Sequence, residues 1–267
     1  MEDFSKYNGE GTTLRKVQLR LLDMMVEIDR ICRRHNIQYW ITFGTLLGAI
    51  RHGGFIPWDD DLDISMPSND LKRFLEIAPK ELPKDLFVQT TKTDPSFKRP
   101  IVRVRLMNSL FITRCEDFYR DYNKGLFVDI FETLPYPDVN LSFQRFIFKW
   151  YSKANGFFYF KQDVTLKNHI AAITFPFIKS GFHLIWSILN LFPKNKLGSK
   201  IQLNLSGSSF TKDTIFPLKD IAFEGHNFLG PADPDRLLTI VYGDYLKIPS
   251  KDKRTTHSNI VIFNFPE

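Results

Sequence analysis

A group of aspartates near residue 60 has the spacing expected of a cation-binding site. Asp61 and Asp63 are separated by one residue, in a run where polar and apolar residues alternate from Asp61 to Met66. This period of two predicts a strand that carries both carboxylates on one face. Paired carboxylates are ligands for hard cations such as Mg²⁺ or Mn²⁺. A D-x-D pair on its own is equally compatible with a solvated acidic turn.

A third carboxylate strengthens the metal interpretation. Asp129 lies in the middle of the apolar run 125–131, which predicts a strand buried on both faces. An ionised carboxylate in such a strand is unfavourable unless it has a partner such as a metal ion. We therefore expect Asp61, Asp63 and Asp129 to form one catalytic metal site, with Mg²⁺ or Mn²⁺ as the cofactor.

Groups that could bind phosphate surround these carboxylates in the sequence. Gly44-Thr45 follows a strand expected over 37–43, and backbone N–H groups at a strand-to-helix turn can bind phosphate oxygens. Arginine side chains suit bidentate phosphate contacts, and the candidates are Arg51, Arg103 and Arg105.

Two histidines and two further aspartates near these groups have open roles. His52 would either contact phosphate or be a structural loop residue, and His257 would either serve the site or belong to a solvated basic tail. Asp59 and Asp60 would either help to hold the metal or, as the alternation favours, orient the loop (Asp59) and point off the metal face (Asp60).

Alternating helical and strand patterns are expected to position these residues. Apolar residues recur at three- and four-residue spacing over 12–36 and 68–78, which predicts two packing helices. Strands are expected over 100–106 and 125–131. The fold class is therefore α/β (α+β), with a sheet core flanked by helices.

Long stretches of the sequence closely resemble the signature of the LicD family. The resemblance is carried by residues 44–52 and 54–64, by 125–131, and by Tyr242-Gly243-Asp244-Tyr245 with Pro249 and His257. This family includes bacterial phosphocholine transferases and shares its domain with the fukutin-related ribitol-phosphate transferases. The resemblance runs from about residue 12 to 260 and weakens over 141–200. One departure is Glu132-Thr133, where many members have Pro and then Leu-Asp.

The resemblance implies a nucleotidyltransferase-like fold and a specific reaction. An alkyl-phosphate group, phosphocholine or a similar polyol phosphate, would pass from a CDP-activated alcohol to a hydroxyl of a cell-surface glycan or lipid-linked precursor, releasing CMP. Asp61, Asp63 and Asp129 would be the catalytic triad of carboxylates, with Gly44-Thr45 as the phosphate turn. The alternatives are a true nucleotidyltransferase that releases pyrophosphate and a non-catalytic membrane-binding protein. The head group and the acceptor glycan stay open.

The net charge of +6 is concentrated in one segment of the 267 residues. Residues 141–200 hold nine basic residues and one acidic residue, so the rest of the chain is slightly acidic. We expect one catalytic domain over 1–267 with a helical basic and aromatic insertion at 141–205, and no nucleic-acid partner. Residues 170–192 would lie in the interface of an anionic membrane or form an ordinary helical subdomain.

Cysteine content and the polar N-terminus set the expected compartment. Cys32 and Cys115 are far apart and form no C-x-x-C pair, so neither a disulfide scaffold nor a cysteine zinc site is expected. Residues 1–11 lack a secretory apolar region. We expect a cytoplasmic protein, peripheral on the cytosolic face of the membrane.

Overall fold

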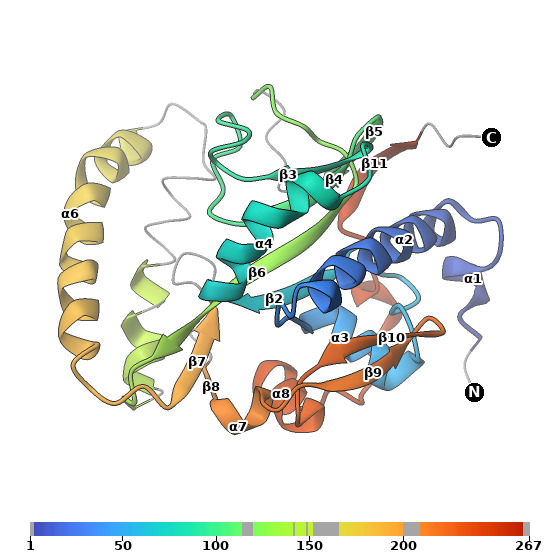
Figure 1. Cartoon of the computed structure of the whole chain (residues 1–267). Helices are drawn as coiled ribbons and strands as arrows, with labels where there is room; N and C mark the ends of the chain where they lie inside the picture. Colours follow the sequence, from blue (N-terminus) through green and yellow to red (C-terminus); the bar gives the residue numbers. More distant parts are fainter. Residues whose placement is uncertain are drawn as a thin grey trace.

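A mixed β-sheet forms the centre of the molecule (Figure 1). The computed structural model describes residues 3–113, 120–140, 142–147, 149–151, 166–199 and 209–263. The sheet has the order β1-β2-β6-β4-β3, and β7 and β8 extend it from β6. Its strands are β1 (Trp40–Ile41), β2 (Asp63–Pro67), β3 (Leu86–Gln89), β4 (Val102–Leu106), β6 (Phe127–Tyr136), β7 (Lys196–Ser199) and β8 (Phe210–Thr211).

Helices flank this sheet, as the sequence predicts. The long helix α2 (Thr13–Arg34) and α4 (Ser68–Glu81) cross the front of the sheet in Figure 1. The spacing of apolar residues in α2 gives one buried face, which includes Val17, Leu21, Met25, Ile28 and Cys32. Thr12 caps the helix by accepting a hydrogen bond from the Arg15 N–H. The expected α/β architecture is therefore confirmed.

The remaining elements pack around this core. The second helical group consists of α3 (Phe43–His52), α7 (Lys212–Ile215) and α8 (Pro234–Tyr242), and α1 (Ser5–Asn8) precedes α2. Two small antiparallel sheets pair β9 (Lys219–Phe223) with β10 (His226–Gly230), and β5 (Ser109–Thr113) with β11 (Ser258–Phe263). A short 3₁₀ turn, η1 (Lys251–Lys253), leads toward β11.

Strand β6 links the two halves of the sheet. It pairs in parallel with β2 and antiparallel with β4 near its start, and antiparallel with β7 near its end. The predicted strand ended at residue 131, whereas β6 continues to Tyr136 because β7 provides partners for Thr133–Tyr136. Conversely, the strand expected over 37–43 is reduced to Trp40–Ile41, and β2 begins at Asp63 and not at Asp61.

The insertion predicted as helical over 141–205 is only partly helical. Residues 142–147 and 149–151 are helical, and α6 (Leu166–Leu189) is a long helix, but β7 lies in the same segment. Strand β7 forms by pairing with the main chain of β6. Gly198 lets β7 approach the ring of Tyr136 closely, because a Cβ at residue 198 would lie 2.6 Å from Cε2 of Tyr136. This pairing depends on a distant strand, so local pattern does not reveal it.

Helix α6 stands at the edge of the molecule, away from the main helices (Figure 1). A small separate core beneath it contains Tyr136, Tyr151 and Phe182. In the part of the chain that the structure describes, no helix combines the length and the apolar character needed to cross a bilayer.

Candidate active site

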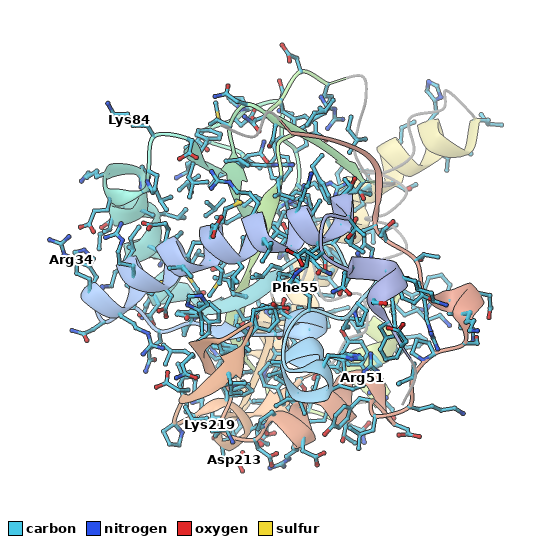
Figure 2. The ribbon with its side chains drawn as sticks, turned by 90° about the vertical axis from the view of Figure 1, so that its right-hand side faces the viewer. Arg34, Arg51, Phe55, Lys84, Asp213 and Lys219 are labelled. Atoms are coloured by element: carbon cyan, nitrogen blue, oxygen red, sulfur yellow. The ribbon has the colours of Figure 1, made fainter. Side chains whose placement is uncertain are left out.

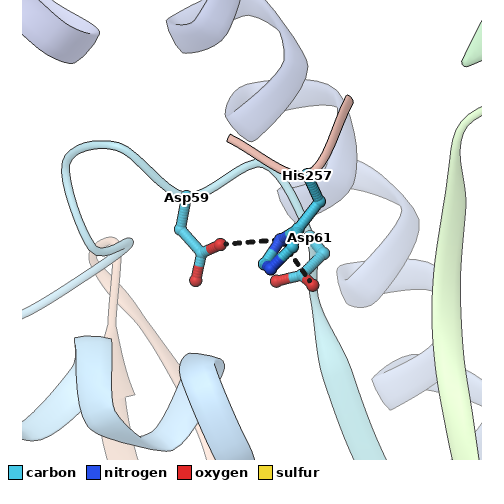
Figure 3. Close-up of side chains that lie close together, drawn as sticks. All are labelled: Asp59, Asp61 and His257. Atoms are coloured by element: carbon cyan, nitrogen blue, oxygen red, sulfur yellow. Dashed lines mark ion pairs between the residues drawn. The ribbon is translucent and has the colours of Figure 1, made fainter. Parts of the chain in front are cut away.

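The loop that enters β2 brings two carboxylates together under an imidazole (Figure 3). Nδ1 of His257 lies 3.4 Å from Oδ1 of Asp59 and 3.1 Å from Oδ2 of Asp61. Hydrogen bonds to these aspartates and to Asp60 raise the pKa of His257. Burial, and then the charge of Asp61, raise the pKa of Asp59 to about 7. The cluster thus concentrates acidic groups whose charge needs a cationic partner.

Asp60 fixes the position of His257 from a distance of almost two hundred residues in sequence. Its carboxylate accepts hydrogen bonds from the backbone N–H of His257 at 2.7 Å and of Ser258 at 2.9 Å, and from the Ser258 hydroxyl. Burial would raise the pKa of Asp60, but the hydrogen bonds from these two residues outweigh burial and lower it. Asp60 therefore connects the acidic loop to the start of β11.

The first turn of α3 lies against the same carboxylates. A Cβ at Gly44 would sit 2.8 Å from Oδ2 of Asp59 and 3.8 Å from Oδ1 of Asp61, so the lack of a side chain at Gly44 allows the Asp59 carboxylate to lie against the helix start. Phe43 begins the helix with a left-handed φ of 45°, a conformation that usually needs structural support in a non-glycine residue. The hydroxyl of Thr45 accepts the Asp63 N–H at 2.8 Å, which fixes the helix start to β2.

Asp63 and Asp129 are direct neighbours across the parallel pair of β2 and β6. Burial, followed by the charges of Asp61 and Asp129, raises the pKa of Asp63. Burial also raises the pKa of Asp129, although Arg103 opposes it with an Nε–Oδ1 ion pair of 2.6 Å. The guanidinium of Arg103 in turn stacks 3.7 Å from the centroid of the Phe127 ring.

The other predicted phosphate ligands are engaged elsewhere. Arg105 is fully buried and donates to Oε1 of Gln89 and the carbonyl of Gly125. Arg51 lies at the far end of α3, where it donates to the Tyr245 carbonyl and to Nε2 of His52 (Figure 2). Their phosphate-binding role stays a prediction.

His52 is surrounded by aromatic rings and not by acidic groups. Its ring contacts Phe4 and Trp58, with centroids 5.7 and 6.2 Å away. Burial, and then the positive charge of Arg51, lower the pKa of His52 to about 4. These contacts favour a structural role for His52 in its loop, and its contact with phosphate stays a prediction.

The structure brings together a different set of ligand atoms from the predicted trio. Among the described residues, the carboxylate and imidazole atoms that all lie within 4.8 Å of one another belong to Asp59, Asp61 and His257. Asp63 and Asp129 lie side by side on the neighbouring strands. Two carboxylate oxygens, together with the imidazole nitrogen in its deprotonated form, are compatible with a divalent cation.

Sequence reasoning favoured a loop-orienting role for Asp59 over help to the metal, and it assigned no role to Tyr242 itself. Tyr242 ends α8, and burial followed by the charges of Asp63, Asp59 and Asp61 raise the pKa of its phenol. The D-x-D-x-D spacing of Asp59, Asp61 and Asp63 was the available signal for the first residue. For Tyr242, the only signal was its place in the resemblance.

The match to a known family coincides with this site. Residues 36–141 match the sequence model of the family described as the LicD/FKTN/FKRP nucleotidyltransferase domain. Over these residues, the chain is similar to the LicD family. Gly44, Thr45 and the aspartates from Asp59 to Asp129 that form the acidic site all lie in this matched stretch, whereas His257 lies outside it.

Curated relatives match the chain over short stretches. The lipopolysaccharide cholinephosphotransferase LicD of Haemophilus influenzae is 46% identical over 65 residues, 24% of each chain. An uncharacterized protein of Rickettsia prowazekii is 42% identical over 79 residues, 30% of this chain and 28% of the relative. Human ribitol 5-phosphate transferase FKRP is 49% identical over 35 residues, 13% of this chain and 7% of the relative. The alignments thus span less than a third of any of these relatives.

Proposed function

We propose that the chain transfers an alkyl-phosphate group from a CDP-activated alcohol to a hydroxyl of a cell-surface glycan or lipid-linked precursor. The observation that carries this proposal is the acidic cluster packed against Gly44, inside the residues that match the LicD family. The names of two relatives, a cholinephosphotransferase and a ribitol 5-phosphate transferase, support phosphotransfer as the reaction class.

The acidic residues would divide into ligands and a proton acceptor. Asp61, with Asp59 and Asp63 beside it, would hold Mg²⁺ or Mn²⁺, which supplies positive charge for a donor diphosphate. Asp129 is held by Arg103, and burial raises its pKa. A carboxylate with a raised pKa is a better general base near neutral pH, so Asp129 would accept the proton of the acceptor hydroxyl.

The proposed transfer makes one P–O bond and breaks another. The acceptor oxygen bonds to the phosphorus distal to cytidine as the bond from that phosphorus to the bridging oxygen breaks. CMP leaves with the bridging oxygen, and the hydroxyl proton passes to a carboxylate oxygen of Asp129. The start of α3 at Gly44 and Thr45 would orient the diphosphate, because N–H groups at a helix N-terminus favour anionic oxygens.

A donor panel tests this proposal directly. The purified chain is incubated with Mg²⁺ and CDP-choline, CDP-ribitol or CDP-glycerol, and release of CMP is measured by chromatography. We expect slow hydrolysis of one donor, with CMP as the nucleotide product, and no pyrophosphate from CTP. Failure of every donor to release CMP, under conditions where the chain is folded, would contradict the proposal.

The domain description favours one alternative enough to include it in the same assay. Because the matching family is described as a nucleotidyltransferase domain, a reaction of CTP or another nucleoside triphosphate with release of pyrophosphate is the second candidate. Pyrophosphate formation without CMP release from any CDP-alcohol would select it. A protein with neither product and no affinity for Mg²⁺ or Mn²⁺ would point to the non-catalytic alternative.

A further inference from the structure

Helix α6 contacts the rest of the molecule along a stripe. Among the side chains of α6 that the structure describes, the buried ones are Phe175, Phe182 and Leu189, at intervals of seven, with exposed fractions of 4%, 5% and 8%. Phe182 packs on Tyr151, and Trp186 packs on Tyr136. Because a seven-residue repeat returns to nearly the same face of an α-helix, these buried residues form one stripe along α6.

The opposite face of α6 is also apolar, although it faces outward. At 100° per residue, its large exposed side chains lie within about 60° of the direction opposite the buried stripe. They are Leu166, Ile170, Ile173, Phe177, Leu184 and Ile188, each at least 53% exposed. A Cβ at Gly181 would meet nothing within 4 Å, so this side of the helix is open. We call these six residues the outer stripe.

The neighbouring helix adds aromatic and basic side chains. Phe143, Phe146 and Trp150 are 48%, 61% and 57% exposed, and Arg145 and Lys149 alternate with them on the exposed surface. Aromatic rings interleaved with basic residues are characteristic of helices that lie in the membrane interface. Both helices therefore expose large apolar side chains, and residues 142–151 add basic residues beside them.

The positive charge of residues 141–200 discriminates between the partners that could cover the outer stripe. Residues 141–200 carry nine basic residues and one acidic residue, and α6 has no acidic residue. A second copy of the chain would bring two strongly basic segments together, which like-charge repulsion disfavours. A bilayer with anionic head groups would satisfy both the apolar stripe and the positive charge.

We propose that the outer stripe of α6 lies in the interface of a membrane that contains anionic lipid. The helix would lie along the membrane plane, with the outer stripe among the upper acyl chains and the exposed Arg145 and Lys149 at the head groups. This orientation agrees with the absence of a membrane-spanning helix among the described residues. The inference does not depend on the identity of the transferred group.

Vesicle flotation with the full chain tests the proposal. Vesicles of phosphatidylcholine with about 30% phosphatidylglycerol provide an anionic surface, and pure phosphatidylcholine vesicles provide a neutral one. We expect recovery with the anionic vesicles and at least about tenfold weaker recovery with the neutral ones. The variant Phe177→Glu/Leu184→Glu should lose at least about tenfold of the anionic recovery.

A matched variant separates the outer stripe from added charge. Leu19→Glu/Met107→Glu introduces the same two charges at exposed apolar positions outside α6, and it should float like the wild type. Circular dichroism verifies that both variants are folded. Equal flotation of the outer-stripe variant and the wild type would overturn the proposal, as would equal recovery on both vesicles or no recovery of the wild type.

Sedimentation velocity tests the second copy as the occupant. We expect both the wild type and Phe177→Glu/Leu184→Glu to sediment as monomers in lipid-free solution. A wild-type dimer that this variant dissociates, combined with no flotation, would assign the outer stripe to self-association and overturn the lipid proposal.

Discussion

At one end of β6, Asp129 is buried beside Asp63; at the other end, Tyr136 supports α6, whose far side exposes Phe177 and Leu184. Charged groups are thus inside at the first end and apolar groups outside at the second. Burial costs the carboxylates free energy, which is why the pKa values of Asp63 and Asp129 are raised. For the aromatic and aliphatic side chains, by contrast, exposure to water is the unfavourable state.

Both regions are energetically unfavourable in isolation and become favourable with the right partner. A divalent cation would compensate the acidic end, and a lipid surface would cover the apolar end. The acidic site is built by α3, β2, the start of β6 and the start of β11, whereas α6 rests on a separate small core at the other end of β6. Changes at one end should therefore leave the other intact.

The largest effect is expected at the acidic end. Replacing Asp61 with asparagine removes a charge that would hold the cation, so CMP release should fall by about 10³-fold. The change preserves side-chain size, so thermal unfolding should be little affected. Asp23→Asn, at an exposed position on α2, is the matched control and should retain activity. Wild-type rates for Asp61→Asn would remove the basis for the proposed metal site.

The two faces of α6 should respond very differently to the same truncation. Phe182→Ala removes a buried ring of the small core and should lower the free energy of unfolding by about 3 kcal/mol. Phe177→Ala removes an exposed ring, so the change should stay within about 0.5 kcal/mol. Urea denaturation of both variants, without lipid, measures the difference. Similar losses would mean that Phe177 is packed in solution.

Two glycine substitutions compare the crowding of the two ends. Gly44→Ala places a methyl group 2.8 Å from Oδ2 of Asp59 and should weaken Mn²⁺ binding by about tenfold. Gly181→Ala on α6 meets nothing within 4 Å and should leave Mn²⁺ binding unchanged. Isothermal titration calorimetry provides both values. Unchanged affinity in Gly44→Ala would place the cation away from α3.

The smallest effect concerns a group buried without an acidic partner. Because the folded-state pKa of His52 is lowered to about 4 from 6.5, the unfolded chain binds more protons between these values. The contribution of His52 to stability is therefore complete above pH 6.5 and is lost as the pH falls toward 4. Discounted for partial exposure, it should amount to about 1 kcal/mol.

Urea denaturation between pH 7 and 4 measures this effect, with His52→Gln as the comparison. The variant should lose stability less steeply with falling pH over this interval. Equal slopes for both proteins would show that other groups control the acid sensitivity.

Local pattern predicts the parts of the fold and the site that depend on neighbouring residues. The helical spacing over 12–36 corresponds to α2, and the apolar run around Asp129 corresponds to the start of β6. Period-two alternation also placed Asp63 in a strand, where it meets Asp129 in register. The finer statement, a nucleotidyltransferase-like fold, stays a prediction, as does the division into one domain with an insertion.

Long-range contacts account for what the sequence did not reveal. His257 reaches Asp59 and Asp61 because Asp60 binds the backbone of residues 257 and 258. No periodicity connects segments so far apart. Likewise, β7 forms by pairing with the end of β6, which overrides the helical pattern of its own segment. Arg103 and Arg105 alternate in the same strand, so the sequence pattern did not distinguish them. In the structure, Arg105 is buried and donates hydrogen bonds to Gln89 and to the carbonyl of Gly125.

The unbroken strand β6 sets the separation between the acidic site and the support of α6. Seven residues separate Asp129 from Tyr136, which corresponds to roughly 23 Å of extended chain. A strand that is hydrogen-bonded to β2, β4 and β7 resists shortening, so it acts as a spacer between the acidic site and the support of α6. With α6 on a lipid surface, an acceptor anchored in that surface would meet Asp129 only if its own extension matched this spacer. Acceptor length would then be a criterion of selection beside acceptor chemistry.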